Sequence, residues 1–243
     1  MNKFLLILLL AAQAAAAAAG ETGCVYDLGG PALIRKSGAA VWQPARKGMP
    51  VGEGDRLQTG KGAWCEVLFR DGTYIKLEEN SETSADTLKS SAAERTFSFS
   101  FLKGKALWLA AKVKGAAASK FIIRTPSAVC AVRGTDFSML VSTAGETTVG
   151  LFEGKVALSS GTVEKELLAG GEASASAGEI AVQARLSRLM QAEQRRYARV
   201  KGRVESLRAR LAQRDSFIDD YVARQQKTLE GFDARRKAKL KKQ

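Results

Sequence analysis

The side chains that could do chemistry in this sequence are carboxylates, arginines and cysteines, because histidine does not occur. Ser-His-Asp and Cys-His nucleophile systems are therefore excluded, and three scattered cysteines make a poor zinc site. Adjacent carboxylates occur at Glu78-Glu79 and Asp219-Asp220. Neighbouring residues point to opposite faces of a strand and diverge on a helix, so neither pair predicts acid–base catalysis. We expect a protein that is not an enzyme and that needs no cofactor or metal.

The block Arg133-Gly134-Thr135-Asp136 is the candidate binding site. Arg133 lies among apolar residues, and a buried arginine needs a carboxylate or carbonyl partner. Candidate carboxylates for this pairing are Asp55, Asp71 and Asp136. In the alternative interpretation, Arg133 and Thr135 only lock a β-turn, with Gly134 allowing a bulge or a close backbone approach.

The cysteines allow two interpretations. Cys65 and Cys130 are the candidate disulfide pair, because disulfides persist in oxidising compartments. Alternatively, both are small buried residues. Cys24 is the odd cysteine left over.

Residues 25–177 are rich in glycine, threonine and short apolar alternations, which indicates β-structure. The runs 64–69 and 74–77 flank Asp71-Gly72, and Asp-Gly between two β-rich runs is a strong hairpin signal. Closely spaced strands with glycine-rich turns are typical of an all-β sandwich, roll or solenoid. The polar stretch 85–94 is predicted to be a loop or linker.

From residue 179 onward the sequence has helical periodicity. Steps of three or four residues separate the members of one stripe, which is the a/d pattern of a coiled coil. A helix of about 50 residues would be about 75 Å long and cannot bury such a stripe alone. We expect it to pair with a second copy through residues 186–232, with another protein, or partly with the β domain. The stripe consists of Leu186, Leu189, Glu193, Tyr197, Val200, Val204, Leu207, Leu211, Arg214, Ile218, Tyr221, Gln225, Leu229 and Phe232.

The same segment holds most of the charge. Residues 179–243 contain 18 Lys and Arg against 8 Asp and Glu, so they carry +10 of the net charge of +13. A concentration of one sign on one element favours an anionic partner, for example an acidic membrane surface.

The N-terminus has the pattern of an export signal. Lys3 precedes the apolar run 4–10, and alanines follow up to Ala19. A short apolar core that ends in small residues is typical of a secretory signal peptide, and we expect cleavage after Ala19. The alternative is a membrane anchor, which needs about 20 apolar residues, and Gln13 interrupts this run. Glu21, three positions before Cys24, argues against lipid attachment.

Several motifs occur in one ordered series. The first is Gly54-Asp55-Arg56-Leu57-Gln58-Thr59-Gly60, followed by the hairpin Asp71-Gly72-Thr73. The most specific block is Thr125-Pro126-Ser127-Ala128-Val129-Cys130-Ala131-Val132-Arg133-Gly134-Thr135-Asp136-Phe137, and the series closes with Gly154-Lys155-Val156 and Ala169-Gly170-Gly171-Glu172. Over residues 50–175 this series resembles the FecR domain family.

The resemblance implies an extracytoplasmic β-rich module used in sensing and binding. The best-known members of the family are inner-membrane regulators that relay receptor occupancy to a sigma factor. Only three residues precede the apolar run here, so we expect a stand-alone exported member without a cytoplasmic anti-sigma segment.

These features together predict an organisation and a function. We expect a signal peptide at 1–19, N-terminal strands at 20–49, a FecR-like β domain at 50–177 and a basic helical tail at 178–243. The predicted function is a non-enzymatic binding or scaffold module of the periplasm or cell envelope. Its partner would be a protein or an envelope polymer, and its tail would oligomerise or dock on an anionic membrane surface. The alternative is a periplasmic signalling adaptor that relays to a membrane partner. Nucleic acid is not an expected partner.

Overall fold

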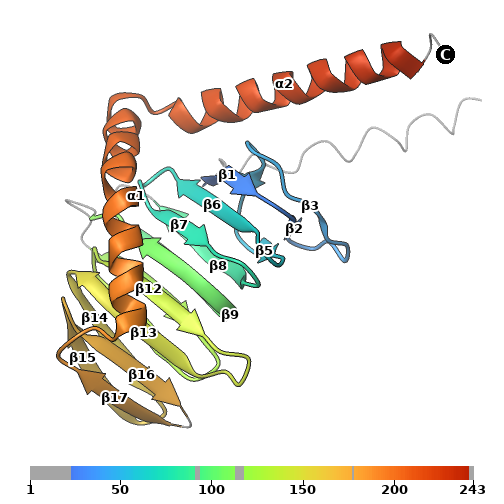
Figure 1. Cartoon of the computed structure of the whole chain (residues 1–243). Coiled ribbons are helices and arrows are strands. Elements are labelled where there is room, and N and C mark those ends of the chain that lie inside the picture. Colours follow the sequence, from blue (N-terminus) through green and yellow to red (C-terminus); the bar gives the residue numbers. More distant parts are fainter. Residues whose placement is uncertain (1–22, 91–93, 113–117, 177, 241–243) are drawn as a thin grey trace, which may run out of the picture.

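The computed structural model describes residues 23–90, 94–112, 118–176 and 178–240. Strands fill the chain as far as residue 183, and two helices follow (Figure 1). The prediction of a mainly β protein with helices near the C-terminus is confirmed. The predicted start of the helical tail at residue 178 is wrong, because Glu179–Gln183 form a strand and the first helix begins at Arg188. The predicted signal peptide at 1–19 lies outside the described residues.

The elements have the following bounds. The strands are β1 (Gly23–Gly29), β2 (Ala32–Arg35), β3 (Gln43–Pro44), β4 (Pro50–Val51), β5 (Arg56–Thr59), β6 (Trp64–Phe69), β7 (Tyr74–Leu77), β8 (Glu82–Ser90), β9 (Glu94–Leu109), β10 (Ala118–Arg124), β11 (Val129–Val132), β12 (Asp136–Val141), β13 (Thr147–Glu153), β14 (Lys155–Ser160), β15 (Val163–Leu168), β16 (Glu172–Ser176) and β17 (Glu179–Gln183). The helices are α1 (Arg188–Gln213) and α2 (Phe217–Leu240).

The strands form two sheets that share β9. The first, which we call the helix-covered sheet, has the order β4-β1-β6-β7-β9-β12-β13-β16-β17. The second, the open sheet, has the order β3-β2-β5-β8-β9-β10-β11-β14-β15. The pairing of β9 with β10 is parallel, and the other pairings in these two orders are antiparallel. From β10 onward, successive hairpins alternate between the sheets, which gives the sandwich a solenoid-like stacking.

One apolar core lies between the sheets. Side chains on the inner faces of both sheets form a single cluster. Its centre is aromatic: Trp108 of β9 stacks on Phe137 of β12 at 6.3 Å between ring centroids. Burying a phenylalanine stabilises a fold by about 2 kcal/mol, so this centre contributes much of the stability. The fully buried phenylalanines are Phe69, Phe97, Phe99, Phe101, Phe121 and Phe137.

Strand β9 passes from one sheet to the other at Gly104. Up to Lys103 it pairs with β8 in the open sheet, and from Gly104 it pairs with β12 in the helix-covered sheet. Strands that switch sheets bend at the corner. Gly104 has φ +94°, and a Cβ added there would lie 2.4 Å from the backbone of Ser81. Glycine is therefore required at this corner.

We expect Gly104→Ala to lower the free energy of unfolding by at least about 2 kcal/mol more than Gly62→Ala does, because only the first adds a steric clash. Gly62 is the matched control: its φ is +67° and a Cβ there would meet nothing within 4 Å. Urea denaturation of both variants measures the difference. Equal losses would show that β9 does not bend against Ser81.

The helical segment is not the single long helix that the periodicity predicts. It divides at residues 214–216, where Arg214 is extended with φ −147°. A helix-start signal is present in the sequence at this point, since Asp215 and Ser216 are typical N-cap types. Asp219 and Asp220 then fall in the first turn of α2, where carboxylates favour the helix dipole.

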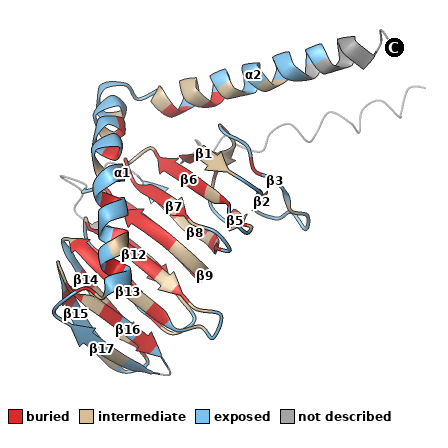
Figure 2. Cartoon of the chain, in the orientation of Figure 1, coloured by how far each residue is buried: buried red, intermediate tan, exposed pale blue. Residues whose placement is uncertain are grey.

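Helix α1 crosses the helix-covered sheet from β13 to β6 (Figures 1 and 2). Most of the α1 stripe is buried against the outer face of the helix-covered sheet. A coiled coil with a second chain is therefore not needed to cover it. The cluster consists of Leu68, Tyr74, Leu107, Leu109 and Phe152 from the sheet and Leu186, Met190, Tyr197, Val204 and Leu207 from the helix segment. Of the three pairings expected for the stripe, the one with the β domain is the one the structure shows.

Candidate binding groove

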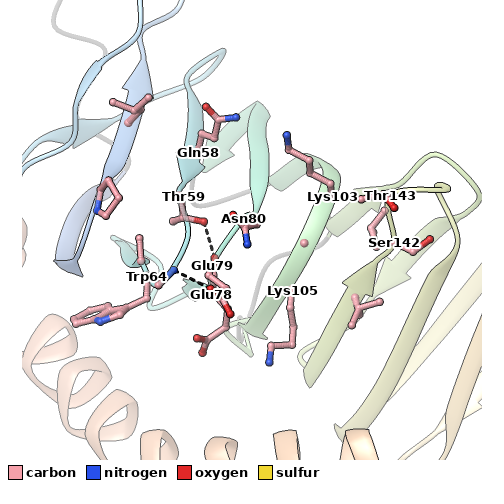
Figure 3. A pocket seen from close by; sticks show the side chains of 18 of the residues that line it. Gln58, Thr59, Trp64, Glu78, Glu79, Asn80, Lys103, Lys105, Ser142 and Thr143 are labelled. Carbon is pink, nitrogen blue, oxygen red and sulfur yellow. Dashed lines mark hydrogen bonds between the residues drawn. The ribbon is translucent and has the colours of Figure 1, made fainter.

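A groove lies beside the N-terminal half of α1. It has a volume of about 990 Å³ and crosses the rim where chain segments pass between the two sheets (Figure 3). Its walls come from the turn after β5, the turn after β7, the bend of β9, the end of β12 and one face of α1. The lining includes Pro31, Leu33, Thr59, Gly62, Trp64, Glu78, Glu79, Asn80, Lys103, Lys105, Leu140, Ser142, Thr143, Leu189 and Arg196.

One wall is acidic and anchored to the backbone. Glu79 accepts a hydrogen bond from the Gly62 N–H at 2.8 Å, and the Thr59 hydroxyl donates to the Glu78 carbonyl at 2.6 Å. Asn80 turns the chain with φ +55°, a conformation that asparagine tolerates better than most residues. The Glu79 carboxylate and the Glu78 backbone are thus fixed on the groove wall.

The facing wall is basic and is tied to α1. Lys105 of β9 forms an ion pair with Glu193 of α1 at 2.9 Å, and Arg196 pairs with the same carboxylate at 3.1 Å. Glu193 is buried, which explains why the helical stripe contains a carboxylate. Lys103 pairs with Glu82 at 3.6 Å. The basic wall is therefore held in place by the same contacts that seat the helix.

Apolar side chains also line the groove, with Trp64 beside Glu78 and Glu79 on the side away from Lys105 (Figure 3). Trp64 is half-buried, and the Lys76 ammonium lies 5.0 Å from its ring centroid. Leu189 of α1 is 48% exposed although it belongs to the helical stripe. A groove that offers a tryptophan and charges of both signs suits a polypeptide segment, because tryptophan and arginine are among the residues that dominate protein interfaces.

The predicted site block is not part of this groove. Arg133 is exposed, because β11 alternates and places Cys130 and Val132 inward. Its three candidate carboxylates are engaged by other residues: Asp55 by Lys36, Asp71 by Arg95 and Asp136 by Tyr197. The hypothesis of a buried Arg133 ion pair is therefore corrected, and the buried arginine of this region is Arg95.

Of the remaining residues of the block, Asp136 contacts α1, and Gly134 and Thr135 pack within the β domain. Gly134 has φ +57°, and a Cβ there would lie 2.7 Å from Lys112. Thr135 is buried and packs against Gly154, where a Cβ would come within 2.4 Å of its methyl group. Asp136 accepts a 2.9 Å hydrogen bond from the Tyr197 hydroxyl of α1. Asp136 thus connects the β domain to α1.

The pKa values near this contact shift in opposite directions. Burial raises the pKa of Asp136, and the hydrogen bond from Tyr197 lowers it in part. The neighbouring Glu153 is exposed enough to keep its charge, and the hydrogen bond from Lys201 lowers its pKa. Asp136, Glu153 and Lys201 line a smaller polar cleft of about 430 Å³ beside α1.

Because its pKa is raised, we expect Asp136 to contribute stability that is fully present at pH values below its ordinary pKa of 3.8. The folded state binds this proton more readily than the unfolded state, so the contribution is lost as pH rises through the folded pKa. Asp136→Asn keeps an acceptor for Tyr197 and removes the titration. The free energy of unfolding of wild type minus that of the variant should fall with rising pH. A difference that does not change with pH would contradict the burial of the carboxylate.

The cysteines are thiols in the structure. Cys65 lies in β6 of the helix-covered sheet and Cys130 in β11 of the open sheet, and both are free and buried in the core. Burial raises the pKa of each to about 12, so neither is a reactive thiolate at neutral pH. This arrangement corresponds to the alternative of small buried residues rather than to a disulfide.

Sequence reasoning did not find the groove. Trp64 was assigned only to a hairpin strand, and Glu78 and Glu79 were considered only as a catalytic pair. The sequence shows a tryptophan next to a Gly-rich turn. This pattern does not predict a groove, because the other walls come from β12 and α1, which are distant in the sequence. No helix of the described segments is both long and apolar enough to cross a membrane.

Comparison with known families agrees with this architecture. Residues 55–157 match the model of the family described as FecR protein, so the chain contains a FecR domain. The match runs from the start of β5 into β14 and includes most groove walls and the Arg133–Asp136 block. It does not include α1, which supplies Leu189 and Arg196. None of the curated proteins matches the chain.

Solved structures offer a distant likeness. Two crystal structures described as a "putative anti-sigma factor" from Parabacteroides distasonis match with a TM-score of 0.45 and 22% identity. Each match covers 54% of the present chain and 59% of the other chain.

Proposed function

We propose that this protein is an exported, non-enzymatic signalling adaptor that binds a segment of a protein partner in the Trp64 groove. The observation that carries the proposal is the groove itself, whose lining combines a tryptophan at one side with carboxylates and lysines. The FecR domain supports it, because the family resemblance implies sensing and binding outside the cytoplasm. The groove also uses α1, so occupancy of the groove and the position of the helices are physically linked.

Helix α2 provides an arm that could relay occupancy of the groove to a partner. Its first turns are held on β1, where Ile218 and Val222 pack on Cys24 and the Tyr221 hydroxyl donates to the Tyr26 carbonyl at 2.5 Å. The C-terminal part of the helix extends away from the domain (Figure 1), and Phe232 is 62% exposed. The arm thus offers an apolar residue on a basic helix to a membrane-bound partner.

Photo-crosslinking in the native host tests the groove. A photoreactive amino acid at Thr143, an exposed groove residue, should crosslink to one protein, and Trp64→Ala should abolish that product. The same amino acid at Lys165 on β15, an exposed site away from the groove, is the control. Crosslinks that are equal at both sites, or that survive Trp64→Ala, would contradict the proposal. Capture of a cell-wall polymer instead of a protein would favour the scaffold function.

The basic tail supports a second candidate function, docking on an anionic envelope surface. Each Lys or Arg near an acidic membrane adds about 1 kcal/mol, and salt screens this attraction. Fractionation with low-salt and high-salt washes, together with the mass of the mature N-terminus, tests location and docking. A start at Gly20 with release by salt supports export and surface docking. An uncleaved cytoplasmic protein would overturn both candidate functions.

A further inference from the structure

The edge strands at the two ends of the sandwich differ in length and in proline content. At the N-terminal end the edges are β3 and β4, which are short and contain Pro44 and Pro50. Proline cannot donate a backbone hydrogen bond, so it protects an edge from pairing with another chain. At the other end β17 (Glu179–Gln183) pairs with β16. Among the described residues no strand pairs with its other side, and β17 has no proline.

Strand β17 exposes side chains that belong to the core face. Ile180 and Val182 lie opposite the buried Ala175 and Ala173 of β16, so they face the interior of the sandwich. Val182 is nevertheless 43% exposed, because no further strand continues the sheet beyond it. Glu179, Ala181 and Gln183 lie on the outer face. Ile180 packs on the core, and Val182 leaves part of the core face exposed beside β15 of the open sheet.

We propose that β17 pairs with β17 of a second copy, antiparallel and centred on Ala181. This register sets Ile180 opposite Val182 of the second copy and Glu179 opposite its Gln183, so apolar meets apolar and no like charges face each other. Pairing in this way joins the helix-covered sheets of the two copies into one sheet. The interaction is isologous, as expected for a two-fold dimer.

The charges at the two ends of β17 favour a second copy of this chain as the partner. They also favour antiparallel over parallel pairing. The strand begins with Glu179 and is followed by Arg185, both exposed. Antiparallel pairing brings the acidic start of each strand to the basic end of the other. Parallel pairing would set Glu179 beside Glu179 and Arg185 beside Arg185. This interface is separate from the Trp64 groove and leaves it open, so the proposal stands independently of the proposed function.

A cysteine at the two-fold axis gives a direct test. Directly opposite residues of antiparallel strands have Cα atoms about 4.5–5.5 Å apart, within the range of a disulfide. The purified chain with Ala181→Cys should form a disulfide-linked dimer in air within minutes. Val41→Cys is the control, since Val41 is 76% exposed near the other end. Equal rates of dimer formation by both variants would overturn the register.

Charge exchange tests the orientation and keeps the proposal falsifiable if Ala181→Cys folds poorly. Sedimentation velocity should show the wild-type chain as a concentration-dependent dimer. Glu179→Arg and Arg185→Glu should each weaken dimerisation at least about tenfold, and the double exchange should restore it. A wild-type chain that stays monomeric at high concentration would overturn the proposal, as would a double exchange that restores nothing.

Discussion

Arg95→Met is expected to lower the free energy of unfolding by about 3–5 kcal/mol, because it leaves a buried carboxylate without its counterion. Arg95 and Asp71 are 3% and 5% exposed at their side chains, and Arg95 Nη2 lies 2.5 Å from Asp71 Oδ2. The guanidinium also donates to the Thr73 hydroxyl at 2.8 Å and lies 4.8 Å from the Phe97 ring centroid. Chemical denaturation of the purified chain measures the loss.

Lys155→Met is the matched control for this loss. Its ion pair with Glu166 has a similar distance, 3.1 Å, but the side chains are 69% and 59% exposed, so the expected loss is below about 1 kcal/mol. Removing both buried charges with Asp71→Leu and Arg95→Met should recover part of the stability. If Arg95→Met and Lys155→Met lose equally little, the Arg95 ion pair is not buried.

Val204→Asp is expected to lower the free energy of unfolding by about 3 kcal/mol or more, since it places a carboxylate in an apolar contact. Val204 of α1 is fully buried and packs with Leu68, Tyr74 and Leu109 of the sheet. Burial of this helix face is what joins α1 to the FecR domain. Thermal and urea unfolding, followed by circular dichroism, measure the effect.

Ser206→Asp on the exposed face of the same helix is the control and should change stability by less than about 0.5 kcal/mol. If both variants unfold like the wild type, α1 does not pack on the sheet, and the stripe is free to pair with another chain. If Val204→Asp loses stability and Ser206→Asp does not, the helix and the β domain are one folding unit.

The strands were predictable where local chemistry decides them. Asp71-Gly72 predicted the hairpin, and β6 and β7 pair there in antiparallel register. The stretch 85–94 was predicted as a loop, yet β8 continues to Ser90. After Ser84, β8 pairs with β9 and no longer with β5. Polar residues of this part lie on one face of the strand, and Ala85 and Leu88 lie on the buried face. A register shift between Ala85 and Thr87 interrupts the alternation, which hid the strand from pattern reading.

The helical stripe was recognised, but its partner was not. A period of 3.5 residues tells which side chains are buried and does not tell against what. Here the partner is the outer face of the helix-covered sheet, built from Leu68, Leu107 and Phe152. Those residues read as ordinary strand residues, because a sheet covered on both faces loses its alternation. The polar stripe member Glu193 is explained by the tertiary structure, because it pairs with Lys105 of β9.

The residues that line the candidate groove were not predictable from the sequence, and the predicted Arg133–Asp136 block lies outside that groove. The Arg133–Asp136 block is structurally central, since Asp136 holds Tyr197 and Thr135 packs on Gly154. Asp136 contacts α1 there, which a single sequence does not reveal. The groove depends on Trp64, Lys105 and Leu189, three residues from distant parts of the chain. Only the tertiary arrangement brings these together.

The central claim is that the Trp64 groove transmits a signal, and the transcript profile of the native host tests it most directly. The measurement compares a deletion strain with strains that carry Trp64→Ala or Trp42→Ala, at matched protein levels. Trp42 is the control aromatic, half-buried at β3 and outside the groove. The account predicts that Trp64→Ala reproduces the transcript changes of the deletion strain and that Trp42→Ala resembles wild type. A Trp64→Ala strain indistinguishable from wild type would contradict it.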